Sequence, residues 1–109
     1  MDMPKQLRLT GRFFHRTTLK AARAIQANGF RDKTGFYLTS QAQRCGVWLS
    51  NVPLDCNEGA WGDVLLEVRI PSRLIKRFEW VEKGKGYREF LVPADLVNAR
   101  GRIREVEEA

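Results

Sequence analysis

The sequence predicts an α+β domain with one N-terminal helix and two packed, mainly antiparallel β-sheets. One early segment has the composition and periodicity of a helix, and most of the later segments are short, β-type and separated by turns. The length of 109 residues suffices for one hydrophobic core and is too short for two. We therefore expect a single domain over residues 1–109.

The clearest elements lie near the N-terminus. A short strand is predicted at residues 12–16, and it brings the only histidine, His15, to its end. A helix is predicted over residues 19–28, because good helix formers follow one another there with apolar residues at helical spacing. Either Thr17 or Thr18 can cap its first turn.

The end of this helix is predicted at Gly29, because glycine readily adopts the left-handed conformation of a helix C-terminus. Phe30 is expected to fold back onto Ile25, the hydrophobic contact of a Schellman motif. The helix should therefore have a defined beginning and end.

The remaining elements are short. The predicted strands are rich in β-branched and aromatic residues and are bounded by glycine or proline. We predict strands at residues 35–39, 45–50, 64–70, 78–81, 87–92 and 102–106, a loop over residues 51–62, and helical turns beginning at Pro71 and Pro93.

The charge is distributed unevenly along the chain. The sequence has 19 Lys and Arg against 13 Asp and Glu, a net charge of +6. Residues 1–44 contribute +7, residues 45–68 contribute −4 and residues 69–109 contribute +3. A basic segment attracts phosphate-bearing ligands or nucleic acid, and a solvated basic surface is the plain alternative.

Composition excludes several classes of protein. A hydrophobic content of 43% argues against a disordered basic tail. No apolar run approaches the roughly 20 residues of a membrane-spanning helix, and no secretory signal is recognisable, so we expect a cytoplasmic protein with no membrane partner. Cys45, Cys56 and His15 are too few for a disulfide scaffold or a four-ligand zinc site, so we expect no metal.

Common catalytic signatures are absent from the sequence. It contains no G-x-S-x-G, Cys-x-x-Cys, P-loop or G-x-G-x-x-G pattern. A lone histidine is more often structural than catalytic, so His15 by itself predicts no chemistry.

The order of several weak motifs is more specific than any one of them. Phe-Phe-His-Arg-Thr-Thr at residues 13–18 precedes the helix ending in Gly-Phe, and Gly-Val-Trp-Leu-Ser at 46–50, the strand 64–70 and Tyr-Arg-Glu-Phe-Leu-Val-Pro at 87–93 follow. Over roughly residues 11–105 this order resembles the catalytic domain of the ADP-ribosyltransferase superfamily, on the side of poly(ADP-ribose) polymerases and diphtheria toxin. RNA 2′-phosphotransferases are more distantly similar. The resemblance implies a split β-sandwich fold.

The resemblance also implies an activity, with NAD as co-substrate. The enzyme would cleave the nicotinamide–ribose bond and transfer ADP-ribose to a protein or nucleic-acid acceptor or to water. By this resemblance Glu89 stabilises the oxocarbenium-like centre and binds the 2′-hydroxyl of the nicotinamide ribose, and Trp48 offers a flat face to nicotinamide. His15 binds the 2′-hydroxyl of the adenosine ribose, Thr17 contacts a ribose, and the backbone of Arg16 pairs with the nicotinamide carboxamide.

Two departures from the family's pattern concern this site. Arg16 replaces a glycine, which would crowd the backbone contact with nicotinamide. Trp48 replaces a tyrosine, and Tyr37 in the segment Gly-Phe-Tyr-Leu is the competing candidate for that aromatic position.

Each of the two main assignments also has a structural alternative. Glu89 can be the outward residue of an alternating strand, and Trp48 can be a core residue. The transfer chemistry needs an anion near the cation that develops as nicotinamide leaves, and one carboxylate can supply it.

The alternative function is non-enzymatic: a basic nucleotide- or nucleic-acid-binding module on a degenerate transferase fold. It depends on the +7 segment and on exposed aromatic residues, such as Phe13 or Tyr37, that would stack on bases.

Overall fold

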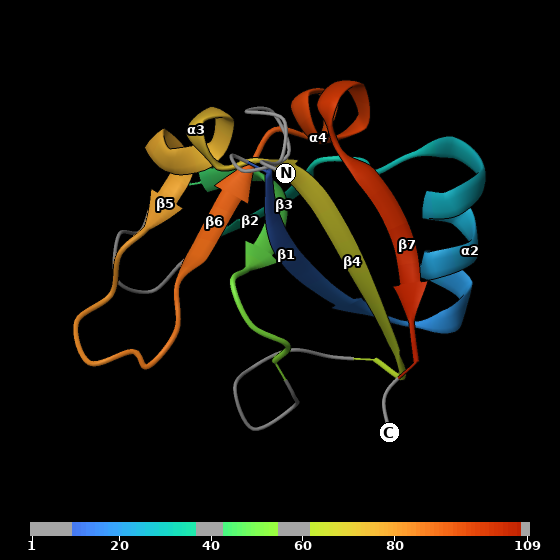
Figure 1. Cartoon of the computed structure of the whole chain (residues 1–109), viewed down its shortest axis with the longest axis horizontal. Helices are drawn as coiled ribbons and strands as arrows, with labels where there is room; N and C mark the ends of the chain where they lie inside the picture. Colours follow the sequence, from blue (N-terminus) through green and yellow to red (C-terminus); the bar gives the residue numbers. More distant parts are fainter. Residues whose placement is uncertain (1–9, 37–42, 55–61, 108–109) are drawn as a thin grey trace, which may run out of the picture.

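The computed structural model describes residues 10–36, 43–54 and 62–107 of the chain. They form an open antiparallel sheet with helices packed against it (Figure 1). In chain order the elements are β1 (Thr10–Thr17), α2 (Leu19–Asn28), β2 (Lys33–Phe36), β3 (Gln43–Ser50), β4 (Val64–Pro71), α3 (Ser72–Ile75), the 3₁₀ turn η2 (Lys76–Phe78), β5 (Glu79–Trp80), β6 (Glu89–Val92), α4 (Ala94–Arg100) and β7 (Arg102–Val106).

The sheet consists of two halves that meet at one residue pair. Its strand order is β5-β6-β3-β1-β4-β7, and β2 pairs with β3 off this path. β1 pairs with β4 along its whole length, but among the described residues it pairs with β3 only through Phe14 and Ser50. Figure 1 shows β5 and β6 on one side of this junction and β4 and β7 on the other.

The α+β class is as predicted, but the arrangement within it differs in two respects. The described residues form one open sheet rather than two packed sheets, because the Phe14–Ser50 pair makes strands of both halves neighbours. Alternation along a strand predicts which face is buried, and it does not predict which strands pair. The predicted helix has the expected bounds as α2 and follows the predicted first strand, but it is one of three helices in the described part of the chain rather than the one helix of the predicted architecture.

The core lies between one face of the sheet and the helices. β4 contributes every second residue to it, so the other residues of that strand lie on the opposite, outer face. Phe13 and His15 of β1 pair directly with Val68 and Leu66, so both lie on the core face. The buried cluster includes Phe13, Ala22, Val64, Leu66, Val68, Ile70, Ile75, Ala94 and Val97.

Both ends of α2 are fixed by side chains. The hydroxyl of Thr18 accepts a hydrogen bond from the Ala21 N–H at 3.1 Å, as predicted for an N-cap. Gly29 has a positive φ of 85°, but its ψ of 172° is extended rather than left-handed helical, so the predicted Schellman ending is wrong. Instead the side chain of Asn98 accepts from the Phe30 N–H at 2.8 Å and donates to the Phe30 carbonyl at 2.9 Å.

The outer face of β1, β4 and β7 contains a buried carboxylate. Glu67 is 0% exposed and pairs with Arg12, Arg69 and Arg104 at 2.6, 2.9 and 3.0 Å. Burial by itself raises the pKa of Glu67, but hydrogen bonds from Arg104, Arg12 and Arg69 outweigh it and lower the pKa from 4.5 to about 2. One carboxylate therefore ties three strands together.

Replacing Glu67 with glutamine should lower the free energy of unfolding at pH 7 by about 2 kcal/mol. The pKa shift from 4.5 to about 2 corresponds to roughly 3 kcal/mol, and solvent around the half-exposed arginines screens part of it. Because the folded-state pKa is lowered, this stabilisation is complete above about pH 4.5 and is lost as the pH falls towards 2.

Urea unfolding of the wild type and Glu67→Gln across this pH range measures the effect. Glu105→Gln, an exposed carboxylate on β7, is the matched control and should leave stability unchanged. A difference between the wild type and Glu67→Gln that is the same at pH 7 and at pH 2 would contradict the prediction.

Candidate functional site

A cleft of about 750 Å³ lies where β1 and β3 diverge. Its walls are the end of β1, one side of α2, the second half of β3 and residues of the β5–β6 connection. Small-molecule sites usually measure about 300–1,000 Å³ and combine apolar walls with a few converging polar groups. The cleft fits that description, because Ile25, Phe30 and Trp48 line it together with charged residues of both signs.

Most of the predicted site residues line this one cleft. The end of β1, the middle of β3 and the beginning of β6 each contribute to it, although these segments are far apart in the sequence. The predicted residues in its lining are His15, Arg16, Thr17, Trp48 and Glu89. Tyr37, the competing aromatic candidate, lies outside the described residues.

His15 is held from two sides. Its Nδ1 donates to the Trp48 carbonyl oxygen at 2.8 Å, and its ring lies edge-on to Phe30 with the ring centres 5.1 Å apart. A carbonyl oxygen can only accept, so Nδ1 carries the proton in the neutral ring. Nε2 is then the acceptor nitrogen of the imidazole.

Trp48 is half-buried, whereas its neighbours Val47 and Leu49 belong to the core. Because residues alternate along a strand, Trp48 lies on the opposite face of β3 from the core cluster, and it lines the cleft. Its ring lies edge-on to Trp80 of β5, with 5.7 Å between ring centres. Trp48 is therefore not a core residue, which was the structural alternative that the sequence allowed.

Glu89 is paired with a lysine that sequence reasoning did not identify. Lys85 Nζ lies 2.6 Å from Glu89 Oε1 and 3.5 Å from Glu82 Oε1. Burial lowers the pKa of Lys85, but the hydrogen bond and charge of Glu89, with smaller contributions from Tyr87 and Glu82, raise it above its ordinary value. Lys85 therefore stays charged and neutralises the carboxylate. The only signal in the sequence was its position four residues before Glu89, which means little outside a helix.

Arg16 and Thr17 connect β1 to the segments that flank the cleft. Nε of Arg16 donates to the Leu54 carbonyl oxygen, which holds the 51–54 segment against the strand. Thr17 is buried, and its backbone packs closely on Gly62, the residue before the turn into β4. These contacts fix the position of the cleft wall.

One predicted binding residue is corrected by the structure. Phe13 was a candidate for stacking on nucleic-acid bases, but it is only 6% exposed and lies edge-on to Phe90 inside the core. The physical reason is its register: Phe13 pairs with Val68, whose side chain also belongs to the core. Phe30 is the aromatic residue that contacts His15, and the sequence indicated it only as the residue after the helix.

Comparisons add no known relative. The chain matches no protein-family model, no curated protein and no solved structure. In the part of the chain that the structure describes, no three His, Cys, Asp or Glu side chains gather as metal ligands. No helix among the described residues is long and apolar enough to span a membrane. The cleft is therefore the feature of the molecule that points to a function.

Gly62→Ala should destabilise the protein by at least about 2 kcal/mol. Gly62 has a φ of 120°, and a Cβ there would overlap the Thr17 carbonyl group, so strain and a backbone clash combine. Gly84→Ala is the matched control, because Gly84 has a φ of 87° but no atom within 4 Å of an added Cβ. It should cost only about 1 kcal/mol. Thermal unfolding compares the two variants, and equal losses would count against a close contact at Thr17.

Proposed function

We propose that the chain is an NAD-dependent ADP-ribosyltransferase, which transfers ADP-ribose to a macromolecular acceptor or to water. The observation that supports this best is that His15, Trp48 and Glu89 all line one cleft, His15 from the core face of the sheet and Trp48 and Glu89 from its outer face. The resemblance assigned roles to these residues from three separate strands.

The nicotinamide ring would lie against Trp48. An indole ring offers a large flat surface for offset stacking, and Trp80 supports it from the side. Arg16 would bind the carboxamide through its backbone. The hydrogen bond from the Arg16 side chain to the Leu54 carbonyl oxygen supports this role. It holds the side chain, which is bulkier than the family's glycine, against the 51–54 segment.

His15 would bind the 2′-hydroxyl of the adenosine ribose through Nε2. The donor role of Nδ1 toward the Trp48 carbonyl fixes the tautomer in which Nε2 accepts a hydrogen bond. The edge-on contact with Phe30 fixes the plane of the ring. A neutral, oriented imidazole can therefore select a hydroxyl group without changing its charge.

Glu89 would stabilise the reacting carbon. As the C1′–N bond breaks, its electron pair goes to the nicotinamide nitrogen, and positive charge develops at C1′ of the ribose. A nearby carboxylate lowers the energy of that state. The acceptor's lone pair then forms the new bond to C1′, and the proton of the acceptor is released to solvent.

The ion pair between Lys85 and Glu89 must open before Glu89 can act in this mechanism. While Lys85 lies 2.6 Å from Glu89, its charge offsets the negative field that the reaction needs. The diphosphate of NAD offers Lys85 a stronger anionic partner, and its transfer from Glu89 to the diphosphate would expose the carboxylate charge as substrate binds. The positive N-terminal end of α2, where Thr18 and Ala21 line the cleft, would attract the same diphosphate.

Glu89→Gln should reduce nicotinamide release from NAD by at least about 100-fold, because it removes the charge that stabilises the transition state and keeps the shape of the side chain. Chromatography of released nicotinamide, with protein, DNA and RNA acceptors offered in turn, measures the rate. Glu105→Gln is the control and should retain full activity. The proposal fails if the wild type releases no nicotinamide, or if Glu89→Gln releases it equally fast.

His15→Ala should abolish the rise in melting temperature that NAD causes in the wild type. A ligand that binds only the folded state raises its stability in proportion to the logarithm of its relative concentration, and the loss of a binding contact removes that gain. Each protein is compared with itself without NAD, so a change in intrinsic stability does not enter. Arg23→Gln on the exposed side of α2 is the control and should retain the shift. A shift of equal size in His15→Ala would exclude the proposed ribose contact.

A further inference from the structure

We propose that the outer face of β1, β4 and β7 binds the phosphate backbone of a nucleic-acid duplex. We call this surface the arginine face, defined by Arg12, Arg69, Arg102 and Arg104 around Glu67. None of these residues lines the cleft. The inference therefore does not depend on the proposed reaction with NAD.

Three of the arginines form a row across the sheet. In the strand register Arg12 is directly opposite Arg69, and Arg69 is directly opposite Arg102. Neighbouring strands lie about 4.8 Å apart, so three cations are anchored within about 10 Å of one another. Like charges directly opposite each other destabilise a sheet. Repulsion within this row therefore destabilises the sheet locally, and a bound anion would remove that repulsion.

Glu67 orients the arginines without cancelling their charge. Its two carboxylate oxygens are bound by Arg12, Arg69 and Arg104, whose side chains are 55, 52 and 63% exposed. Four arginines and one glutamate leave a surplus of three positive charges. Arg102 forms no ion pair with any residue that the structure describes, and it borders a depression of about 310 Å³ with Arg69 and Arg104.

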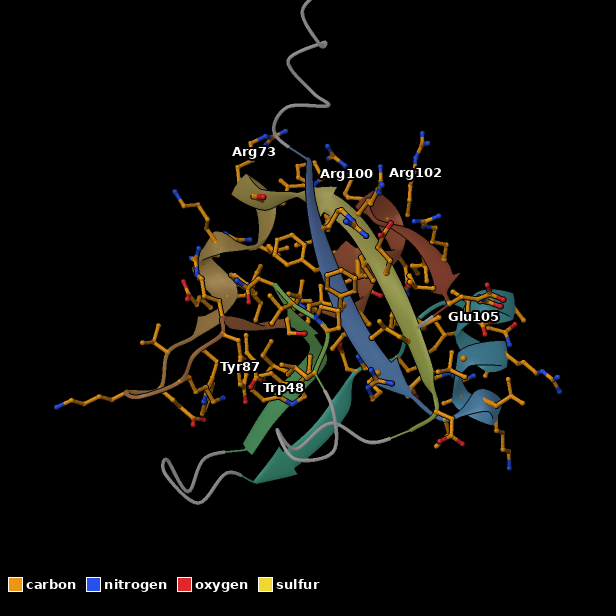
Figure 2. All side chains as sticks on the ribbon, turned by 60° about the horizontal axis from the view of Figure 1, so that its bottom comes forward. Trp48, Arg73, Tyr87, Arg100, Arg102 and Glu105 are labelled. Carbon is orange, nitrogen blue, oxygen red and sulfur yellow. The ribbon has the colours of Figure 1, made fainter. Side chains whose placement is uncertain are left out.

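The positive surface continues past one end of these strands. Figure 2 shows Arg73 of α3, Arg100 at the end of α4 and Arg102 at the beginning of β7 along the same edge of the molecule. Trp48, on the cleft side, lies far from this edge in the same view. An extended polyanion would therefore contact the strand row and this edge together.

The chemistry of the face favours a duplex backbone. Guanidinium groups bind phosphate oxygens with two parallel hydrogen bonds, and duplexes present a dense row of phosphates. Single-strand binding needs exposed aromatic rings for base stacking. Phe14, the aromatic residue of β1 on this face, is only 8% exposed and lies 5.5 Å from the Arg12 guanidinium. The large exposed apolar side chains of the described residues are Leu19, Val52 and Val81, none of them on this face, which disfavours a membrane surface.

The test uses fluorescence anisotropy with a labelled 20-base-pair DNA duplex at increasing salt concentrations. The double variant Arg69→Gln/Arg102→Gln should weaken binding at 0.1 M salt roughly tenfold or more. It should also reduce the slope of log affinity against log salt by about 1.8, that is, about 0.9 for each lost phosphate contact. The control, Lys20→Gln/Arg23→Gln, removes the same charge from the exposed side of α2, which packs on the opposite face of the sheet, and should keep the wild-type slope.

Arg102→Gln alone provides a second test if the double variant does not fold, because it breaks no ion pair with a described residue. It should reduce the slope by about 0.9. The proposal is overturned if both double variants weaken binding equally, if the wild type does not bind the duplex at low salt, or if the single strand of the same sequence binds more tightly. Binding that requires Arg102 but occurs only to vesicles containing anionic lipid would also overturn it.

Discussion

Ser50 holds the two halves of the sheet together. It pairs with Phe14 in the ladder, and its buried hydroxyl lies 3.3 Å from the Phe14 carbonyl oxygen and 2.7 Å from the Val52 carbonyl oxygen. One residue beyond this junction, His15 reaches the Trp48 carbonyl with its side chain instead of its backbone. The cleft lies where β1 stays paired with β4 after Phe14 but no longer pairs with β3.

The consequence is a molecule with two chemically different surfaces. The cleft contains charges of both signs that are partly paired with each other, as Lys85 and Glu89 show. The arginine face has one carboxylate for four cations and lies on the outer face of β1, β4 and β7. Strand β1 contributes to both surfaces: Arg12, whose side chain lies on the outer face, belongs to the arginine face, and His15, whose side chain lies on the core face, lines the cleft.

The net charge of the chain gave a misleading impression of where an anion would bind. The basic surplus of residues 1–44 suggested an N-terminal binding segment. Of the four residues of the arginine face only Arg12 belongs to that segment, and the others come from β4 and β7. A linear sum of charge cannot anticipate this, because strand pairing brings together Arg12 and Arg69, 57 positions apart, and Arg69 and Arg102, 33 positions apart.

The sequence by itself determined the local elements: α2 with a threonine cap, the breaks at proline and glycine, and most of the strands. The strand predicted at 35–39 lies only partly within the described residues, where β2 spans Lys33–Phe36. These local elements depend on interactions between near neighbours, which composition and periodicity record. It also indicated His15, Trp48 and Glu89, but only through the order of motifs. Only the tertiary structure decided that they share a cleft, that Lys85 neutralises Glu89, that Phe13 is buried, and that one open sheet replaces two packed ones. Each of these outcomes depends on which strand pairs with which and in what register, and pairing between distant strands leaves no local signature in a single sequence.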